Sequence, residues 1–508
     1  MKIILVILAF CSLFVNRLWA KDKDTISLTE HLSLWKRTFN EVERNPAFMH
    51  DAYATSMTYM QLKLDNQTAN RAIQLEKGSS HTLMGASVKS FLKLNQYQTV
   101  WGYASYRIGR KRQIMFNSTS DYDLLYPYVM GDTLGGNLEN EQYAFGGGYG
   151  TDAGRWHWGA EMKFRAEHEY RTIDPRPRGI ATDLTLRLGV AYQLSNYKLG
   201  MGAGVRTYKQ TNNVDFYNPL GVIPVYHFTG LGTDYVRFAG AIRSSYYKAT
   251  GFIADFQMVP LLANGFYFSL QQTFMPYQNI LTELNALPIS KLNVNETEVK
   301  MGWKLGGKFA FAPYAGLYRE LREGNECVAG SSSSTEYKSL ITLSMFSNKK
   351  TEVYLGSAVH WQLDKQTKNT HDFTLDGRLG WLDERAEYVD LKREMSYQKV
   401  FARLAWQWMW QSGKQWLIRW DGNVAHYHNT SRHILMPYAW MDKQITSLVD
   451  HTYAMKTAHQ WNCSTTSQVY HYPERWKGVG IFLSVEAAME HLTNIRQYQI
   501  QTSVGFTF

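Results

Sequence analysis

Charged side chains recur at alternate positions along several stretches of the chain, a spacing that could line a passage for charged solutes. Side chains two residues apart share one face of a β-strand, and rings of charged side chains select ions in pores. The residues assigned to this face are Arg155, Glu161, Lys163, Arg165, Arg187, Arg206, Arg237, Arg378, Arg403 and Arg419. We expect them to line a watery interior, either paired with acids such as Asp376, Asp421 and Glu486 or forming a basic passage for anionic solutes.

A histidine pair offers the clearest metal-binding spacing. His426 and His428 lie two residues apart, with His433 nearby, so two imidazoles could share one strand face and bind a metal. His426, however, has the same parity as Trp420 and Val424, which belong to the apolar face. A strand end beside a loop explains the histidines more simply, and we predict no metal site.

Gly200, Gly202 and Gly204 resemble part of a dinucleotide-binding fingerprint, but they lie inside an alternating strand pattern. That fingerprint requires a strand followed by a helix. We therefore interpret these glycines as room for an N-terminal plug or for a close side chain. The chain has no Gly-x-Ser-x-Gly motif or other nucleophile signature. We predict no enzyme activity, no catalytic residue and no cofactor, with an outer-membrane enzyme as the weakest alternative.

The last segment carries the clearest structural pattern. One parity is largely apolar and aromatic, and the other holds glutamine, serine, glycine and threonine. The first parity comprises Tyr498, Ile500, Thr502, Val504, Phe506 and Phe508. This terminal strand resembles the assembly signal of Gram-negative outer-membrane β-barrels. The resemblance implies insertion by the barrel-assembly machinery and closure of the last strand against the first.

The same two-residue period recurs upstream in runs of roughly 10 to 13 residues, which is long enough for a tilted strand to cross a bilayer. Strands of soluble proteins average about 5 or 6 residues. The runs lie at 156–164, 184–192, 373–381, 400–410, 416–424 and 479–489. Five tryptophans flank one predicted hairpin, either as an interface girdle or as a stacking platform for a sugar or lipid. They are Trp406, Trp408, Trp410, Trp416 and Trp420.

These runs predict an all-β fold, a closed antiparallel transmembrane barrel of about 14–18 strands. Turn signals occur at 150–154, 195–196, 263–265, 347–350 and 412–414, and longer polar connections at 110–141, 209–232, 276–295, 321–336, 382–397 and 428–477. Up-and-down parity requires a further strand within 428–477, which we place near Val449 to Met455. Short turns beside long loops are typical of outer-membrane barrels.

Three segments precede or form the barrel. Residues 1–20 read as a cleaved secretory signal peptide. Residues 21–50 form an amphipathic helix, capped by Ser27 with Glu30, that is a plug or a periplasmic segment. Residues 51–508 form the barrel. The plug candidates are Leu28, Leu32, Trp35, Phe39, Val42, Asn45 and Pro46.

The sequence Asn45-Pro46-Ala47, between a helical segment and the first strand, is similar to the long-chain fatty-acid transporter (FadL-like) family. That resemblance implies an N-terminal hatch inside the barrel. The rest of the chain resembles an uncharacterised outer-membrane barrel family with no assigned activity. A TonB-dependent receptor is disfavoured, because such proteins place a large globular plug before a barrel of 22 strands.

Composition agrees with a barrel exported to the outer membrane. Aromatic residues reach 14% while mean hydropathy is only −0.36, and no apolar run beyond the N-terminus has the roughly 18 residues of a spanning helix. Without residues 1–20 the net charge is about +8, with the charges scattered, which disfavours nucleic acid. Cys327 and Cys463 lie in polar, strand-poor stretches, and their pairing stays open.

Two functions follow from these patterns. The first is a channel or uptake porin for a small solute, in contact with outer-membrane lipid. The alternative is a binding or scaffold barrel that partners another envelope complex. The identity of a solute, the oligomeric state and the openness of the lumen are not encoded in any pattern that we find.

Overall fold

The computed structural model describes residues 25–39, 44–218, 223–236, 238, 240, 242–330, 339–363, 369–437, 443–476 and 478–508. The predictions for residues 1–20, Val42 and Arg237 concern residues outside this set. No helix within the described part of the chain combines the length and the apolar character needed to span a bilayer.

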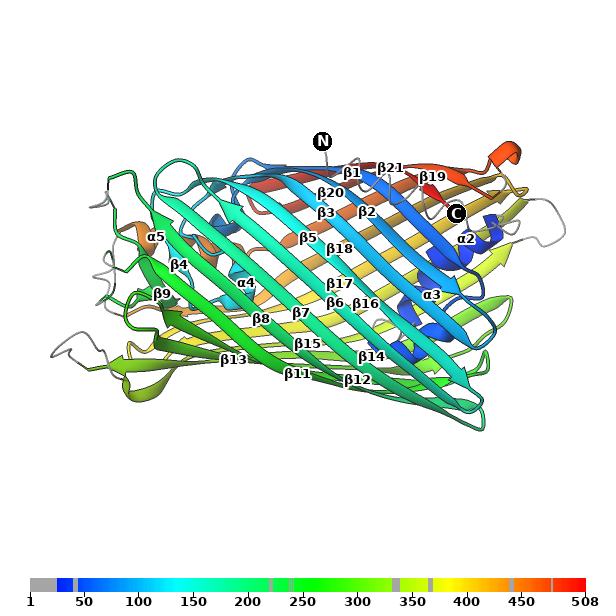
Figure 1. Cartoon of the computed structure of the whole chain (residues 1–508), viewed down its shortest axis with the longest axis horizontal. Helices are drawn as coiled ribbons and strands as arrows, with labels where there is room; N and C mark the ends of the chain where they lie inside the picture. The colour runs from blue at the N-terminus through cyan, green and yellow to red at the C-terminus, as the bar shows by residue number, and fades with distance from the viewer. Residues whose placement is uncertain are drawn as a thin grey trace.

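Eighteen strands form one closed antiparallel ring (Figure 1). Each strand pairs with the next along the chain, and β21 (Ile495–Thr507) closes the ring on β1 (Met57–Ala69). Closure leaves no strand edge with unpaired backbone groups, which a bilayer requires. The predicted closed barrel is confirmed, and its strand number lies at the upper end of the predicted range.

The other strands of the ring follow in chain order. They are β2 (Ser80–Lys93), β3 (Gln98–Ile114), β5 (Gly136–Ala153), β6 (Trp156–Tyr170), β7 (Arg176–Leu194), β8 (Tyr197–Asp215), β11 (Ser244–Pro260), β12 (Gly265–Leu281), β13 (Leu287–Lys304), β14 (Phe309–Ala329), β15 (Ser339–Leu363), β16 (Asn369–Tyr388), β17 (Arg393–Ser412), β18 (Trp416–Leu435), β19 (Gln460–His471) and β20 (Gly480–Leu492).

Most strands are longer than the predicted 10 to 13 residues, up to 25 residues in β15, whereas β19 with 12 residues lies within that range. The expected loops at 276–295 and 382–397 are mostly strand, and the expected turn at 347–350 lies inside β15. Those predictions were wrong because strand ends that project beyond a bilayer carry polar residues on the outward face, while inward residues such as Tyr277 and Leu292 pack inside the barrel end. Such polar residues hide the two-residue period while the backbone ladder continues.

The strand predicted near Val449 to Met455 is also wrong, because this segment lies in the helix α5 (Lys443–Thr457). Buried Ile445, Leu448 and Val449 have helical spacing. The additional strand that parity required is β19, which follows this helix.

Both cysteines lie in strands rather than in strand-poor segments. Cys327 is in β14 and Cys463 is in β19, and the structure contains both as free thiols. Long polar strand ends again explain the difference from the prediction.

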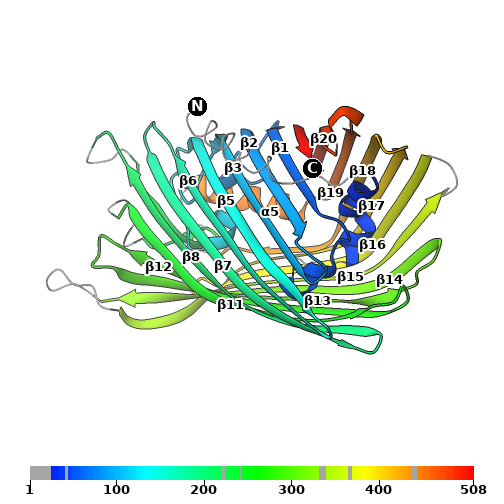
Figure 2. The same ribbon diagram turned by 45° about the vertical axis from the view of Figure 1, so that its right-hand side comes forward.

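The two ends of the barrel differ. One end has short turns such as 154–155 and 195–196, together with the start of β1 and Phe508, whose backbone groups pair with Thr58. Outer-membrane barrels have short periplasmic turns and longer extracellular loops, so we call this end the periplasmic end. The opposite end, here the extracellular end, holds α4 (Tyr122–Leu125), β4 (Met130–Gly131), β9 (Tyr226–Gly230), β10 (Thr233–Asp234) and α5. Figure 1 shows α4, β4, β9 and α5 far from α2 and α3, and Figure 2 shows α5 behind the strands β3 and β5.

The outer surface of the ring is apolar. Leu188 on β7 and Leu379 on β16 are each 68% exposed. The last strand presents Tyr498, Ile500 and Val504 outward in the same way. An apolar exterior on a closed barrel of this size is the architecture of outer-membrane proteins, in which lipid covers these side chains.

We expect Leu379→Arg to lower the free energy of unfolding by about 2–4 kcal/mol, the cost of an arginine facing lipid near the bilayer midplane. Urea unfolding in lipid vesicles, followed by tryptophan fluorescence, measures it. Ser464→Arg is the control, because Ser464 lines a polar interior pocket with Glu490, and its effect should stay within about 0.5 kcal/mol. Equal losses in both variants would contradict a lipid-facing Leu379.

Candidate functional site

The N-terminal segment lies inside the barrel at the periplasmic end (Figure 1). It consists of α2 (Thr25–Leu32), α3 (Leu34–Phe39) and the 3-10 helix η1 (Pro46–Asp51). We call the described residues from 25 to 52 the plug. The structure therefore places the predicted helical segment in the lumen as three short helices rather than one.

The predicted capping box does not form. The helix begins at Thr25, before Ser27, so Ser27 is not its N-cap. Glu30 instead accepts the backbone N–H of Ala54 at 2.9 Å and pairs with Lys36. The glutamate thus ties the helix to the chain that leads into β1, a contact that local sequence cannot show.

The break between α2 and α3 is held by the barrel wall. The buried Gln407 side chain of β17 accepts the N–H of Leu34 at 2.7 Å and donates to the carbonyl oxygen of Leu32 at 3.0 Å. A helix end leaves such groups without intrahelical partners. One wall residue therefore satisfies both sides of the break and fixes the position of the plug.

Leu28 is fully buried in an apolar cluster on the inner wall, and Leu32 packs at the edge of that cluster. The wall and loop residues of the cluster are Met57, Met409, Leu417, Tyr470, Tyr472 and Phe482. Burying a leucine side chain contributes about 1.5–3 kcal/mol. The first plug helix is thus held mainly by apolar contacts.

Phe39 ends the second helix among aromatic wall residues. Its ring lies 5.2 Å from that of Tyr267 and 6.2 Å from that of Tyr314, in edge-on arrangements. Trp35 contacts Phe39 at 4.8 Å and stacks on His360 of β15 at 5.7 Å. Aromatic pairs of this geometry contribute about 0.5–1.5 kcal/mol beyond burial.

Asn45 lies at the centre of a buried polar network. Its side chain accepts the N–H of Ala47 at 3.0 Å, which caps η1, and donates to Gln257 at 3.0 Å. Gln257 donates to Asp255 at 2.9 Å, and Arg187 donates to the other oxygen of Asp255 at 2.9 Å. The Asn45 amide both accepts and donates here, so the wall and η1 together favour this residue type.

Glycines let the plug approach the wall. A Cβ at Gly159 would overlap the Pro46 carbonyl group, and a Cβ at Gly189 would overlap the Asn45 amide. Plug ring atoms lie equally close to Gly200. Only glycine leaves room for this backbone-to-backbone contact.

The glycine interpretation drawn from the sequence agrees with this wall. Gly202 makes room for Asp255 and Gly204 for Arg187, so both accommodate close side chains of the relay. Gly202 also pairs across the sheet with Gly189, which pairs with Gly159. A row of residues without side chains therefore crosses β6, β7 and β8.

Ion pairs complete the attachment of the plug. Arg44 contacts Glu298 and donates to the hydroxyl of Ser269. Lys300 donates to the carbonyl oxygen of Thr38. Sequence analysis did not single out these residues, because they become neighbours only when the plug enters the barrel.

Asp51, the last residue of η1, pairs with Lys198 of β8. Burial alone would raise the pKa of the Asp51 carboxyl group, but the Lys198 ammonium outweighs it and lowers that pKa below its ordinary value. The carboxylate therefore stays ionised and holds the end of the plug on the wall.

The predicted lumen arginines face the interior and are paired. Arg165 makes two hydrogen bonds to Asp121, at 2.9 and 2.7 Å, and one to Glu167 at 2.6 Å. Arg206 makes two to Asp183, at 2.9 and 2.6 Å. The same pairing holds for Arg187 with Asp255, Arg378 with Asp376, Arg403 with Glu352 and Arg419 with Asp421. This arrangement fits paired interior charges rather than a free basic passage.

Arg155 is an exception, since it lies exposed in the turn between β5 and β6 and not on the interior face. Gly154, which precedes it, has a φ of +77° and forms the turn. Strand β6 therefore begins only at Trp156, one residue later than the parity pattern predicts. Glu161 and Lys163 pair with each other at 2.9 Å, and Trp101 donates to Glu161 at 3.3 Å. Arg237 is outside the described residues.

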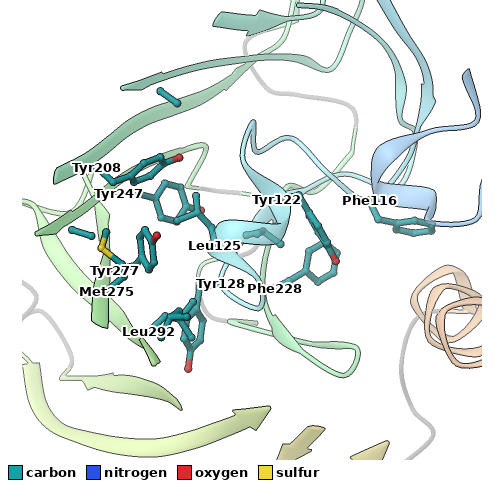
Figure 3. Packing of buried hydrophobic residues seen from close by; sticks show 14 of the residues in the cluster. Phe116, Tyr122, Leu125, Tyr128, Tyr208, Phe228, Tyr247, Met275, Tyr277 and Leu292 are labelled. Atoms are coloured by element: carbon teal, nitrogen blue, oxygen red, sulfur yellow. The ribbon is translucent and has the colours of Figure 1, made fainter. Parts of the chain in front are cut away.

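A second insert closes the extracellular end. The segment that carries α4 and β4 folds inward against wall residues of β8, β11, β12 and β13, as Figure 3 shows for its aromatic cluster. The labelled residues of the cluster are Phe116, Tyr122, Leu125, Tyr128, Tyr208, Phe228, Tyr247, Met275, Tyr277 and Leu292. We call α4, β4, β9, β10 and α5 together the cap.

Charged wall residues anchor the cap. Asp121, which precedes α4, is the partner of Arg165 and also accepts from Tyr208 at 2.8 Å. Arg322 donates to the carbonyl oxygen of Tyr126 at 2.9 Å. Three wall strands thus hold one loop, and a predicted lumen arginine holds the cap in place.

A cavity of about 470 Å³ lies beneath the cap. Its aromatic lining comprises Phe116, Tyr122, Tyr126, Phe228 and Tyr397. Its charged lining comprises Glu76, Asp123, Glu320, Arg322, Lys350, Glu384, Lys399, Lys456 and Glu490. We call this cavity the chamber. It combines stacking surfaces with charges of both signs.

Two charged groups of the chamber stand apart from its ion pairs. Lys399 is 5% exposed, and no carboxylate of the described residues lies within 4.0 Å of its ammonium. Burial raises the pKa of the Glu76 carboxyl group, which accepts a hydrogen bond from Tyr122 at 2.7 Å. A buried cation without a close anion favours a solute that carries one.

The histidine and tryptophan candidates lie on the outside. His426 packs on Trp461 at 4.1 Å and His428 stacks on His459 at 4.4 Å, near the extracellular end. Trp416 is 42% exposed, beside the short turn at the opposite end. Indole rings at both ends of the apolar belt agree with an interface girdle.

We expect Gly189→Val to loosen the plug, because overpacking costs about 1–3 kcal/mol and raises the population of the open form. Trypsin cleavage after Arg44, followed by mass spectrometry, should become about tenfold faster. Gly377→Val is the matched control, since a Cβ there meets only Leu404 at 3.9 Å. Unchanged cleavage in Gly189→Val would contradict the plug contact.

Solved structures that are similar include the outer membrane transporter YddB from Escherichia coli (8% identity, 88% of this chain and 80% of that chain covered, TM-score 0.37). Others are the ferric preacinetobactin receptor BauA from Acinetobacter baumannii (9%, 89% and 80%, TM-score 0.39) and the CymD monoaromatic hydrocarbon channel (9%, 92% and 91%, TM-score 0.30). At these values the likeness carries no information on function.

No curated protein matches the chain. Residues 46–508, which include η1 and the whole ring of strands, match a family described only as a family of unknown function, DUF6850. This match covers most of the chain, and the protein therefore belongs to the DUF6850 family.

Proposed function

We propose that this barrel is a gated uptake channel of the outer membrane for a small solute. The observation that carries the proposal is the pair of inserts, the plug and the cap, which lie inside opposite ends of one lumen, with the chamber enclosed by cap and wall residues. A barrel of 16–18 strands is wide enough to leave an aqueous channel. Two inserts inside such a lumen therefore suggest gating.

The attachment of the plug suits release. Many of its contacts are hydrogen bonds and ion pairs to the wall, such as those of Arg44, Asn45 and Asp51. Each hydrogen bond contributes only about 0.5–1.5 kcal/mol net, because freed groups are solvated by water. A conformational change of the plug can therefore exchange these contacts for water inside a hydrated lumen.

The chamber suggests the class of solute. Aromatic rings such as Tyr126 and Tyr397 offer apolar surfaces, and Lys399 offers a positive charge. We propose an amphipathic solute of small size that carries a carboxylate or similar anionic group. Nine charged lining residues suit such a solute better than a long acyl chain, so the proposal departs here from the fatty-acid transporter resemblance.

The proposal assigns no catalytic step and no cofactor to the chain. It includes export by a signal peptide at residues 1–20 and insertion by the barrel-assembly machinery through Tyr498, Ile500, Val504, Phe506 and Phe508. The alternative is a scaffold barrel for another envelope complex, for which conductance would be absent in every variant.

Planar-bilayer conductance tests the two gates. We expect Gly189→Val, which loosens the plug, and Arg165→Met, which removes the Asp121 anchor of the cap, to conduct little as single variants. The double variant should conduct steadily, because the two closures lie in series. Gly377→Val combined with Arg165→Met is the control. A silent double variant that is correctly folded would favour the scaffold alternative.

Binding tests the solute class. We expect Lys399→Met to weaken binding of benzoate, an aromatic carboxylate, by about tenfold or more, since a hydrogen bond to a charged group contributes about 1.5–3 kcal/mol. Calorimetry measures the affinity, and uncharged benzyl alcohol should bind both proteins alike. Lys414→Met, in an exposed turn, is the control. Loss of benzoate binding in that control would argue against the chamber as the site.

A further inference from the structure

Four metal-binding side chains meet where the plug touches the wall at the periplasmic end. His50 and Asp51 belong to η1, whereas Asp152 lies on β5 and His157 on β6. The donor atoms of His50, Asp51 and Asp152 all lie within 4.8 Å of one another. His157 Nδ1 lies 3.9 Å from a carboxylate oxygen of Asp51 and 3.9 Å from one of Asp152.

His157 supplies an independent sign of a ligand. Its residue is only 3% exposed, yet neither ring nitrogen has a hydrogen-bond partner among the described residues. The Oδ1 atom of Asp152 is likewise buried without a partner in that set. Buried polar groups normally have hydrogen-bond partners. The two ring nitrogens of His157 and Oδ1 of Asp152 depart from that rule, which calls for an explanation.

His50 is oriented as a ligand would be. Its Nδ1 lies 2.9 Å from the hydroxyl of Thr99, which is fully buried in the wall. Its Nε2 points toward Asp51 Oδ1, at 4.0 Å. A second hydrogen bond that fixes the tautomer and the ring is typical of metal-binding histidines.

Lys198 is the ion-pair partner of Asp51 when no metal ion is bound. Its ammonium contacts Asp51 Oδ2, while Asp51 Oδ1 faces His50. With both histidines neutral, two carboxylates and one ammonium leave a net charge of about −1. A divalent cation would reverse that sign, and it would compete with Lys198 for the Asp51 carboxylate.

We propose that His50, Asp51, Asp152 and His157 form a binding site for a divalent transition metal, with zinc as the representative ion. Two imidazoles and two carboxylates form a donor set that zinc accepts in tetrahedral geometry. Ligand atoms around zinc lie about 3.3 Å apart, given bonds of about 2.0 Å. Three donor pairs lie 3.9–4.0 Å apart, and the donors of His50, Asp51 and Asp152 lie within 4.8 Å of one another, so binding needs inward movement of up to about 1.5 Å between donors.

The origin of the ligands determines what the metal does. Two come from the plug and two from the barrel wall, so a bound ion cross-links the two parts. A ligand that binds only the closed form stabilises that form by a free energy that grows with the logarithm of the ligand concentration once it exceeds the Kd. The metal therefore acts as a latch on the plug, whether or not the barrel transports a solute.

Zinc titration of the full-length protein in detergent, after chelator treatment, tests the site. Calorimetry should detect one equivalent whose affinity falls at least about tenfold in Asp152→Asn and in His157→Gln, and about 10–100-fold in Thr99→Val, which removes only the orienting hydroxyl. Lys198→Met should bind zinc more tightly. Zinc should also slow trypsin cleavage after Arg44.

His426→Gln is the control, because the exterior histidines could bind zinc on their own, and it should leave the latch affinity and the trypsin protection unchanged. Thr99→Val and Lys198→Met keep the test decisive if His157→Gln fails to fold. Zinc binding of equal affinity in the wild type, Asp152→Asn and Thr99→Val, or cleavage insensitive to zinc, would overturn the proposal.

Discussion

The pairing of every backbone group within the bilayer is the constraint on which this structure depends. Lipid offers no hydrogen bonds, so the sheet must close, and β21 therefore pairs with β1. Closure at eighteen strands sets a diameter that wall side chains cannot fill. The rest of the structure consists of the segments that occupy that interior.

The interior is occupied by inserts rather than by one packed core, and both apolar clusters and charged pairs hold them in place. Arg165 anchors the cap through Asp121, and Arg44 anchors the plug through Glu298. Paired charges inside a hydrated lumen cost less than charges in an apolar core, because water solvates whatever the partner leaves exposed. Because water can solvate these charged groups, their contacts can be exchanged for contacts with water. A tightly packed apolar interior would not allow that exchange.

The attachment of the plug combines shape with chemistry at one short sequence. Gly159 and Gly189 have no side chains that would keep the plug backbone away. The hydrogen-bonded relay that begins at Arg187 then reaches the Asn45 amide. Close approach and buried hydrogen bonds depend on each other here. The proposed metal site lies beside this contact, at the following turn of the plug, and would strengthen the same closure.

The sequence by itself determined the barrel, its apolar exterior and the interior face of most of its charged residues, because strand alternation is a local property that survives without knowledge of partners. It also indicated a plug around Asn45. Only the tertiary structure decided the register, the length of strands such as β15, the helix at 443–457 and the four ligands near His157. Those features depend on contacts between residues distant in the chain, which a two-residue period does not record.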